Sequence, residues 1–179
     1  MRIIAELKEI ESNGGVRQTF QERYGNLSDT IFLGDIDLEN MSLTSLKGSP
    51  RFISGNFNCS VNSLKNLIGG PIFIGGDFDC SYNSLRNLIG GPQIINGNYN
   101  CSVNKLLTLR GAPISLGGNM DCLYNLEVAE LGSMAVIDKE YFSKVQLDIF
   151  EDGGAERFLE ICRKLNFNYK KVKRFLDLL

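Results

Sequence analysis

Residues 63–83 read SLKNLIGGPIFIGGDFDCSYN, and residues 84–104 read SLRNLIGGPQIINGNYNCSVN. These stretches are two copies of one 21-residue unit. Proline, glycine, cysteine and asparagine recur at this spacing in four columns: Pro50, Pro71, Pro92 and Pro113; Gly55, Gly76, Gly97 and Gly118; Cys59, Cys80, Cys101 and Cys122; and Asn62, Asn83, Asn104 and Asn125. A weaker copy comes before them, with Gly34 in the glycine column. A fixed period of this length predicts a stacked-repeat architecture.

Apolar residues form further columns at the same period. One column alternates with polar neighbours, which is the pattern of a strand with one buried face, and it contains Phe57, Phe78, Tyr99 and Met120. The others contain Ile53, Ile74, Ile95 and Leu116; Leu43, Leu64, Leu85 and Leu106; and Leu46, Leu67, Leu88 and Leu109. One coil cannot bury its own apolar face, so the coils are expected to stack into a mainly β solenoid with parallel strands.

The flanks of the repeats predict helical caps at both ends. Residues 2–11 have apolar residues at helical spacing, and residues 16–24 suit a second short helix closed by Gly25. After the repeats, residues 138–150, 155–165 and those from Asn168 onward suit three more helices. We therefore divide the chain into an N-terminal helical cap at 1–29, the repeat solenoid at 30–126 and a C-terminal helical cap or subdomain at 127–179.

The core of each unit, Phe57-x-Cys59-x-x-Asn62-x-Leu64, resembles the leucine-rich repeat pattern L-x-x-L-x-L-x-x-N-x-L. The unit departs from that pattern at the first leucine place and is short, so the convex side is expected to be extended. The Gly-Asp-Phe-x-Cys-Ser-x-Asn-x-Leu units are also similar to those of short proteins of tailed bacteriophages and bacteria. This resemblance covers about half of the chain, and it predicts the fold but indicates little about the function.

Composition narrows the classes of function. The net charge of −2 does not favour a polyanion binder by bulk charge, and no apolar run is long enough for a membrane span. The N-terminus does not have the pattern of a signal peptide, which suggests the cytoplasm, of a bacterial host if the protein is phage-encoded. The chain contains no histidine, which excludes triads and metal sites that need one. We expect no cofactor and no metal.

The asparagine and cysteine columns have both a structural and a chemical interpretation. In leucine-rich repeats the column asparagine is buried and bonds backbone groups that the turn leaves unpaired, and we favour that role here. Column cysteines point in parallel and lie 21 residues apart, which suits neither disulfides nor zinc ligands. We interpret them, and Cys162, as small buried apolar residues.

The charges of the repeats are segregated. All six acids between residues 31 and 125 fall on outward positions of the predicted strand and its turn, and all six bases fall elsewhere. By the leucine-rich analogy, the outward positions line a concave face suited to a basic partner protein. The predicted contact residues are Asp35, Asp37, Glu39, Asn56, Asn58, Asp77, Asp79, Tyr82, Asn98, Asn100, Asp121 and Tyr124. Alternatively, Asn and Asp merely suit these turns and keep the face soluble.

We therefore expect a non-enzymatic protein-binding module, in its most concrete version a phage-encoded inhibitor of a bacterial host or defence protein. One alternative is nucleic-acid binding through the basic C-terminal helix, with Arg163, Lys164, Lys170, Lys171, Lys173 and Arg174. A second alternative is an enzyme with a carboxylate site near the C-terminal cap, built on Glu127, Glu130 or Asp138. The sequence leaves the oligomeric state open.

Overall fold

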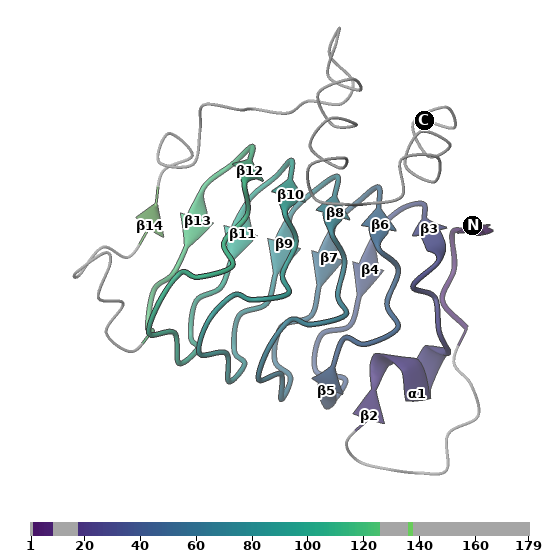
Figure 1. The fold of residues 1–179 in the computed structure, drawn as a ribbon, viewed down its shortest axis with the longest axis horizontal. Coiled ribbons are helices and arrows are strands. Elements are labelled where there is room, and N and C mark those ends of the chain that lie inside the picture. Colours follow the sequence, from purple (N-terminus) through teal and green to yellow (C-terminus); the bar gives the residue numbers. More distant parts are fainter. Residues whose placement is uncertain (1, 9–17, 126–135, 138–179) are drawn as a thin grey trace, which may run out of the picture.

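The computed structural model of the chain describes residues 2–8, 18–125 and 136–137. These residues form a parallel β-solenoid in which each coil gives one short strand to each of two sheets (Figure 1). The first sheet consists, in spatial order, of β1 (Arg2–Ile4), β3 (Thr30–Phe32), β6 (Phe52–Ile53), β8 (Phe73–Ile74), β10 (Ile94–Ile95) and β12 (Ser115–Leu116). The prediction of a mainly β solenoid with parallel strands is confirmed.

The second sheet runs beside the first along the solenoid (Figure 1). Its strands are β4 (Ile36–Asp37), β7 (Phe57–Asn58), β9 (Phe78–Asp79), β11 (Tyr99–Asn100), β13 (Met120–Asp121) and β14 (Val136–Ile137). All its pairings are parallel except that of β14, which runs antiparallel to β13. Two further strands, β2 (Gln18–Thr19) and β5 (Leu43–Ser45), pair with each other near the N-terminal end.

Equivalent residues of neighbouring coils lie directly beside one another. Phe52 pairs with Phe73 in the first sheet, and Phe57 pairs with Phe78 in the second. Each pair is offset by one 21-residue period, so one repeat unit forms one coil. The columns of the sequence are therefore columns in space, spaced by about 4.8 Å, the distance between paired strands.

The apolar columns form one continuous core inside the coils. The isoleucine, phenylalanine, cysteine and two leucine columns are almost fully buried and contact one another. Along the phenylalanine column the rings of Phe57 and Phe78 stack with centroids 5.9 Å apart, and those of Phe78 and Tyr99 lie 4.9 Å apart. Because every coil buries its apolar side chains against the next one, the solenoid is stabilised mainly by burial between coils.

Glycine closes each coil before the next begins. In the Gly-Gly-Pro step, Gly69 has a φ of +85°, and the Gly70 amide donates to the carbonyl of Leu67 at 3.0 Å. A Cβ on Gly69 would also collide with the backbone of Lys47 in the preceding coil. This position requires glycine both for its conformation and for the close approach of the coils.

The N-terminal cap differs from the predicted pair of helices. Residues Arg2–Ile4 form strand β1, which pairs with β3, so the helix predicted over residues 2–11 is wrong there. The physical reason is the open edge of β3, whose backbone groups need partners, and which the isoleucine-rich segment can extend. The second predicted helix is present but shorter, as α1 (Phe20–Tyr24), with a capping box at Thr19 and Gly25 at its end.

The predicted helical C-terminal cap, residues 127–179, lies outside the described residues except for β14. Within the described ranges α1 is the one helix, and the segments between the strands consist of turns, bends and irregular backbone. The fold is thus a β-solenoid whose N-terminal cap is a strand followed by a short helix.

Candidate functional site

The predicted contact residues come together on one face. They stand immediately before β4, β7, β9 and β11, at the last residue of β4, β7, β9, β11 and β13, and in the turns that follow. In Figure 1 these strands stand side by side in one row, so the residues form parallel columns along the solenoid. We call the twelve predicted residues, together with Val61 and Val103 of the same turns, the acidic face.

The column that enters each strand forms a ladder from coil to coil. The Asp35 carboxylate accepts a hydrogen bond from the backbone amide of Asn56 at 2.6 Å. The side-chain oxygen of Asn56 accepts in the same way from the amide of Asp77, and Asp77 accepts from that of Asn98. Asn98 in turn accepts from the amide of Asn119 at 3.0 Å. Each side chain therefore holds the backbone of the following coil.

This ladder explains the glycine column beside it. A Cβ on Gly55 would collide with the Asp35 carboxylate, and a Cβ on Gly76 would collide with the Asn56 side chain. Gly97 and Gly118 have the same relation to the next two members of the ladder. Because the side-chain oxygen occupies the place of a Cβ, the recurring Gly-Asx pair is a structural signature of the stacked coils.

The column that ends each strand bonds within its own coil. The side-chain oxygen of Asp79 accepts from the amide of Ser81 at 2.8 Å, which closes an Asx turn. The equivalent bonds recur in the other coils at Asp37, Asn58, Asn100 and Asp121. The alternative interpretation, that Asn and Asp suit these turns, is therefore confirmed for the geometry of the face.

Carboxylates and amides alternate along this second column. It reads Asp37, Asn58, Asp79, Asn100 and Asp121, so no two carboxylates lie in neighbouring coils. The amide of Asn100 donates to the Asp79 carboxylate at 2.9 Å, and that of Asn58 donates to Glu39 at 3.5 Å. Alternation replaces a repulsion between like charges by a hydrogen bond, and so lets one face carry six acids.

The turn after each of these strands contains a residue in the left-handed conformation. Asn40, Val61, Tyr82, Val103 and Tyr124 all have φ between 50° and 55°. Valine is poorly suited to this region because its branched Cβ approaches the following carbonyl group, at a cost of about 1–2 kcal/mol. Nevertheless Val61, Tyr82 and Tyr124 are exposed, by 40%, 58% and 79%. The face thus displays apolar and aromatic side chains at positions that favour asparagine or glycine.

The asparagine column has the predicted structural role. The buried Asn83 accepts from the amide of Leu64 at 2.9 Å and donates to the carbonyl groups of Cys59, Cys80 and Ser81. Asn62, Asn104 and Asn125 make the equivalent bonds. These side chains hold two coils together, and both N–H groups of each amide are engaged by backbone carbonyl groups.

The column cysteines are free and buried, as predicted. Burial raises the pKa of the Cys59 and Cys80 thiols, which keeps them protonated and unreactive. Cys122 differs, since the hydrogen bond from Cys101 lowers the pKa of its thiol. Among the residues that the structure describes, no group of histidine, cysteine or carboxylate side chains could hold a metal ion.

The alternative sites lie outside the described residues. This holds for the basic residues at 163–174 and for Glu127, Glu130, Asp138 and Cys162. In the described part of the chain, no helix has the length and apolar character needed to cross a membrane.

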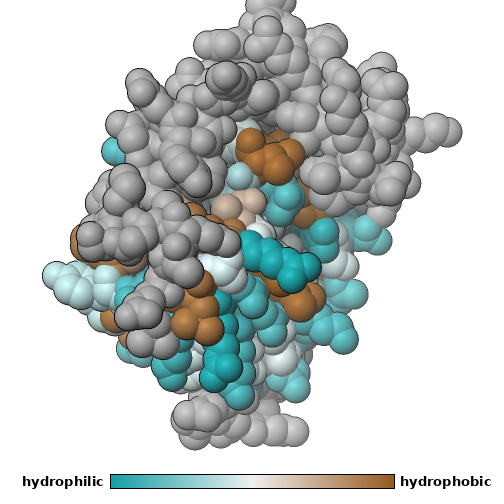
Figure 2. Space-filling model, turned by 60° about the vertical axis from the view of Figure 1, so that its left-hand side comes forward, coloured by the Kyte–Doolittle hydropathy of each residue, from teal (hydrophilic) through white to brown (hydrophobic). Residues whose placement is uncertain are grey.

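The sequence shows that the bases of the repeats lie apart from the acids, but it does not show which bases lie close to one another. Exposed apolar side chains also occur away from the acidic face, and Figure 2 shows hydrophobic groups directly beside hydrophilic ones. Ile68 and Ile89 are exposed although each follows a buried leucine. The signal that could have revealed them is the column itself, since Lys47 and Arg110 occupy the equivalent place in other coils.

Comparison of the chain with protein-family models, with curated proteins and with solved structures finds no match.

Proposed function

We propose that this chain is a non-enzymatic protein-binding module that holds a basic surface of a partner protein against its acidic face. The observation that carries the proposal is the stripe Val61, Tyr82, Val103 and Tyr124 in the left-handed conformation. Three of these side chains are more than a third exposed, so burial of apolar surface does not offset the free-energy cost of their backbone conformation. Backbone strain that presents apolar groups to solvent is typical of a binding surface.

The charges beside the stripe define the partner. Asp77 and Asp35 are exposed, and Asp79 and Asp121 are half-buried in the neighbouring column. No base lies among the repeat residues of this face. A partner surface with Lys or Arg around apolar groups would match both features, with tyrosine providing anchor residues of the kind enriched at interfaces. A phosphate backbone would be repelled.

The similarity of the repeats to units of short phage and bacterial proteins extends the proposal. In that version the chain is encoded by a phage, acts in the host cytoplasm and inhibits a host or defence protein by covering its basic site. This extension rests on the resemblance alone, whereas the binding face rests on the geometry.

The proposal can be tested by affinity capture from nuclease-treated bacterial lysate, with quantitative mass spectrometry. The informative variant is D77N/D79N, because Asn already occupies both columns and keeps the oxygens that the ladder and the turn require. A second variant, Y82N, replaces the tyrosine by the residue that stands at Asn40 in the first coil. Both variants are expected to fold normally and to recover at least about tenfold less partner, as expected for loss of interface hot spots.

A matched control is K105S, which removes a charge outside the acidic face and introduces the residue of the two preceding coils. It should recover the partner as the unchanged protein does. Equal recovery by D77N/D79N, Y82N and K105S would overturn the proposed function.

A further inference from the structure

The bases of the repeats gather on the side of the coil that follows the Asx turns. Two columns lie three residues apart on this segment and are exposed in every coil. One contains Lys65, Arg86 and Leu107, and the other contains Lys47, Ile68, Ile89 and Arg110. Neighbouring coils are joined here by backbone bonds such as Leu107 N–H to the carbonyl of Arg86, at 3.1 Å. We call these seven residues the basic face.

The electrostatics of the basic face contrast with those of the acidic face. Lys65 and Arg86 lie in adjacent coils of one column, with no amide or carboxylate between them. The only acids in residues 41–120 are Asp77 and Asp79, which lie on the acidic face. On the acidic face, neighbouring charges are separated by asparagine. On the basic face Lys65 and Arg86 are stacked directly, whereas Lys47 and Arg110 are separated by two isoleucines, and an external anion would relieve the repulsion between Lys65 and Arg86.

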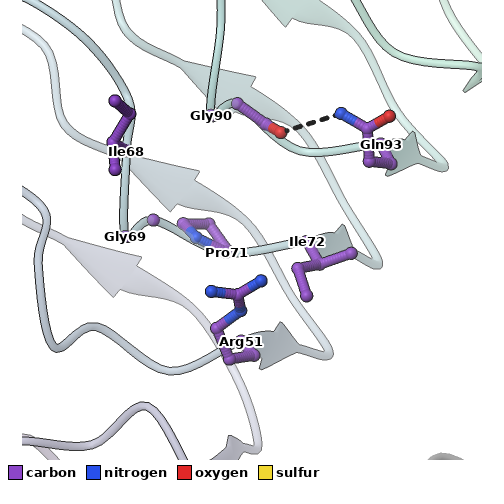
Figure 3. Close-up of a pocket in the computed structure, with 9 residues that line it drawn as sticks. Arg51, Ile68, Gly69, Pro71, Ile72, Gly90 and Gln93 are labelled. Carbon is purple, nitrogen blue, oxygen red and sulfur yellow. Dashed lines mark hydrogen bonds between the residues drawn. The ribbon is translucent and has the colours of Figure 1, made fainter. Parts of the chain in front are cut away.

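A pocket of about 270 Å³ opens beside the columns, where the Gly-Gly-Pro steps of two coils meet. Arg51 is one of the residues that line it, and Figure 3 shows its guanidinium directed towards Pro71. Ile68 and Ile72 give the pocket apolar walls, and the glycines keep it open.

Arg51 is not satisfied within the described chain. Its Nε is buried and has no hydrogen-bond partner in the part of the chain that the structure describes. Desolvation lowers the pKa of the guanidinium, which nonetheless stays protonated at neutral pH. Among the described residues this half-buried cation has no counter-ion, and it lies at the side of an open pocket. A carboxylate entering the pocket could accept two parallel hydrogen bonds from the guanidinium.

We propose that the basic face binds an acidic protein segment in which apolar residues are interspersed with carboxylates, and that one carboxylate of this segment enters the pocket and pairs with Arg51. The apolar residues of the segment pack on Ile68, Ile89 and Leu107, and its remaining carboxylates meet Lys65 and Arg86. This face is separate from the acidic face, so the inference does not depend on the proposed function. A chain with both faces occupied joins a basic partner to an acidic one.

Two features favour an acidic protein segment over a nucleic acid. The basic face exposes Ile68, Ile89 and Leu107, which a phosphate backbone would cover without compensation. The exposed aromatic side chains of the described repeats, Tyr82 and Tyr124, lie on the acidic face, so this face offers no ring on which bases could stack.

The test uses the full chain and three labelled probes in fluorescence anisotropy at low and moderate salt. The probes are a 12-residue peptide of alternating Glu and Leu, a matched peptide of alternating Lys and Leu, and a 12-nucleotide oligothymidylate. The variants are R51I and R51Q, which take the residues of Ile72 and Gln93 in the same column, and K65E/R86E. K105S serves as the control because Lys105 lies outside both basic columns. Circular dichroism and urea midpoints confirm that each variant folds.

The Glu-Leu peptide is expected to bind the unchanged protein and K105S equally, within about twofold. R51I and R51Q should weaken its binding by about tenfold, which corresponds to one charge-assisted hydrogen bond, and K65E/R86E should abolish it. Tighter binding of the oligothymidylate, no binding of the Glu-Leu peptide, or affinity unchanged in R51I and K65E/R86E would each overturn the inference. Binding of the Lys-Leu peptide tests the acidic face instead. D77N/D79N should weaken binding of that peptide and leave binding of the Glu-Leu peptide unchanged, so the two proposals can fail separately.

Discussion

Asn98→Asp tests whether the alternation of amides and carboxylates stabilises the acidic face. The amide of Asn98 donates to the Asp77 carboxylate at 3.3 Å, and the side-chain oxygen of Asn98 accepts from the Asn119 amide. The substitution keeps the second bond, since a carboxylate oxygen accepts equally well. It converts the first into a contact between two carboxylates in neighbouring coils. The expected effect is therefore electrostatic rather than steric.

The magnitude follows from the geometry. At the coil spacing of about 4.8 Å, two unit charges repel by about 0.9 kcal/mol in water and about 3.5 kcal/mol at an effective dielectric constant of about 20. Asp77 and Asn98 are both exposed, so the lower value applies. Loss of the side-chain hydrogen bond adds about 1 kcal/mol. We expect N98D to lower the free energy of unfolding by about 2 kcal/mol at low salt.

The assay is urea unfolding followed by circular dichroism, because urea leaves the ionic strength free to vary. About half of the loss should disappear in 1 M NaCl, where the screening length is about 3 Å. The control is the double variant D77N/N98D, which has the net charge of the unchanged protein and places amides on both sides of the carboxylate. It should recover at least 1 kcal/mol, roughly the repulsion removed. A double variant as unstable as N98D, or a loss insensitive to salt, would refute the reasoning.

Three further predictions concern the columns. V61N places in the second coil the residue that Asn40 provides in the first, and should raise the free energy of unfolding by about 1 kcal/mol in urea denaturation while weakening capture of the partner. N83A leaves buried backbone groups of two coils unpaired and should cost about 3 kcal/mol or more in the same assay, whereas a surface substitution such as K105S should cost little. In a C162S variant treated with a thiol-specific disulfide reagent at pH 8, Cys122 should react first because its pKa is lowered, and the other column cysteines should react only as fast as the protein unfolds.

Most of the fold could be predicted from the 21-residue repeat period. Each column of the sequence, such as Phe57 and Phe78, became a column of paired residues in space, because identical spacing leaves one register in which all apolar residues face inward. The strand formed by Phe52–Ile53 and its equivalents was not recognised as a strand. It is two residues long and both are buried, so alternation could not reveal it. The N-terminal strand was missed because Ile3, Ile4 and Leu7 also fit helical spacing, and the open edge of β3 decided between the two.

The sequence predicted which residues of the acidic face share one surface, but not their hydrogen bonds or the conformation of their turns. The predicted contact residues were identified by their outward positions on the predicted strand and its turn. Their bonds to the next coil, such as that of Asp35 to Asn56, depend on the proximity of the coils. The left-handed turns could not be predicted, since valine and tyrosine are among the residues least expected there. The Arg51 pocket was invisible because its walls come from three coils, and nothing local distinguishes Arg51 from an ordinary surface base.

The ladder of side-chain oxygens on the acidic face shows which property of its residues the fold requires and which property is free to vary. Asp77 and Asn98 both supply the side-chain oxygen that holds the next coil, so the fold requires an Asx residue at each place but does not choose between acid and amide. The distribution of charge over the acidic face is therefore free to match a partner, provided that carboxylates do not lie in adjacent coils. At the stripe of valine and tyrosine the identity of the residues is opposed to the local backbone preference, because the left-handed turn disfavours both residue types. On this surface the backbone tolerates either Asp or Asn, and the stripe departs from the residues that the turn favours. Both features support the proposal that the composition of the acidic face serves binding.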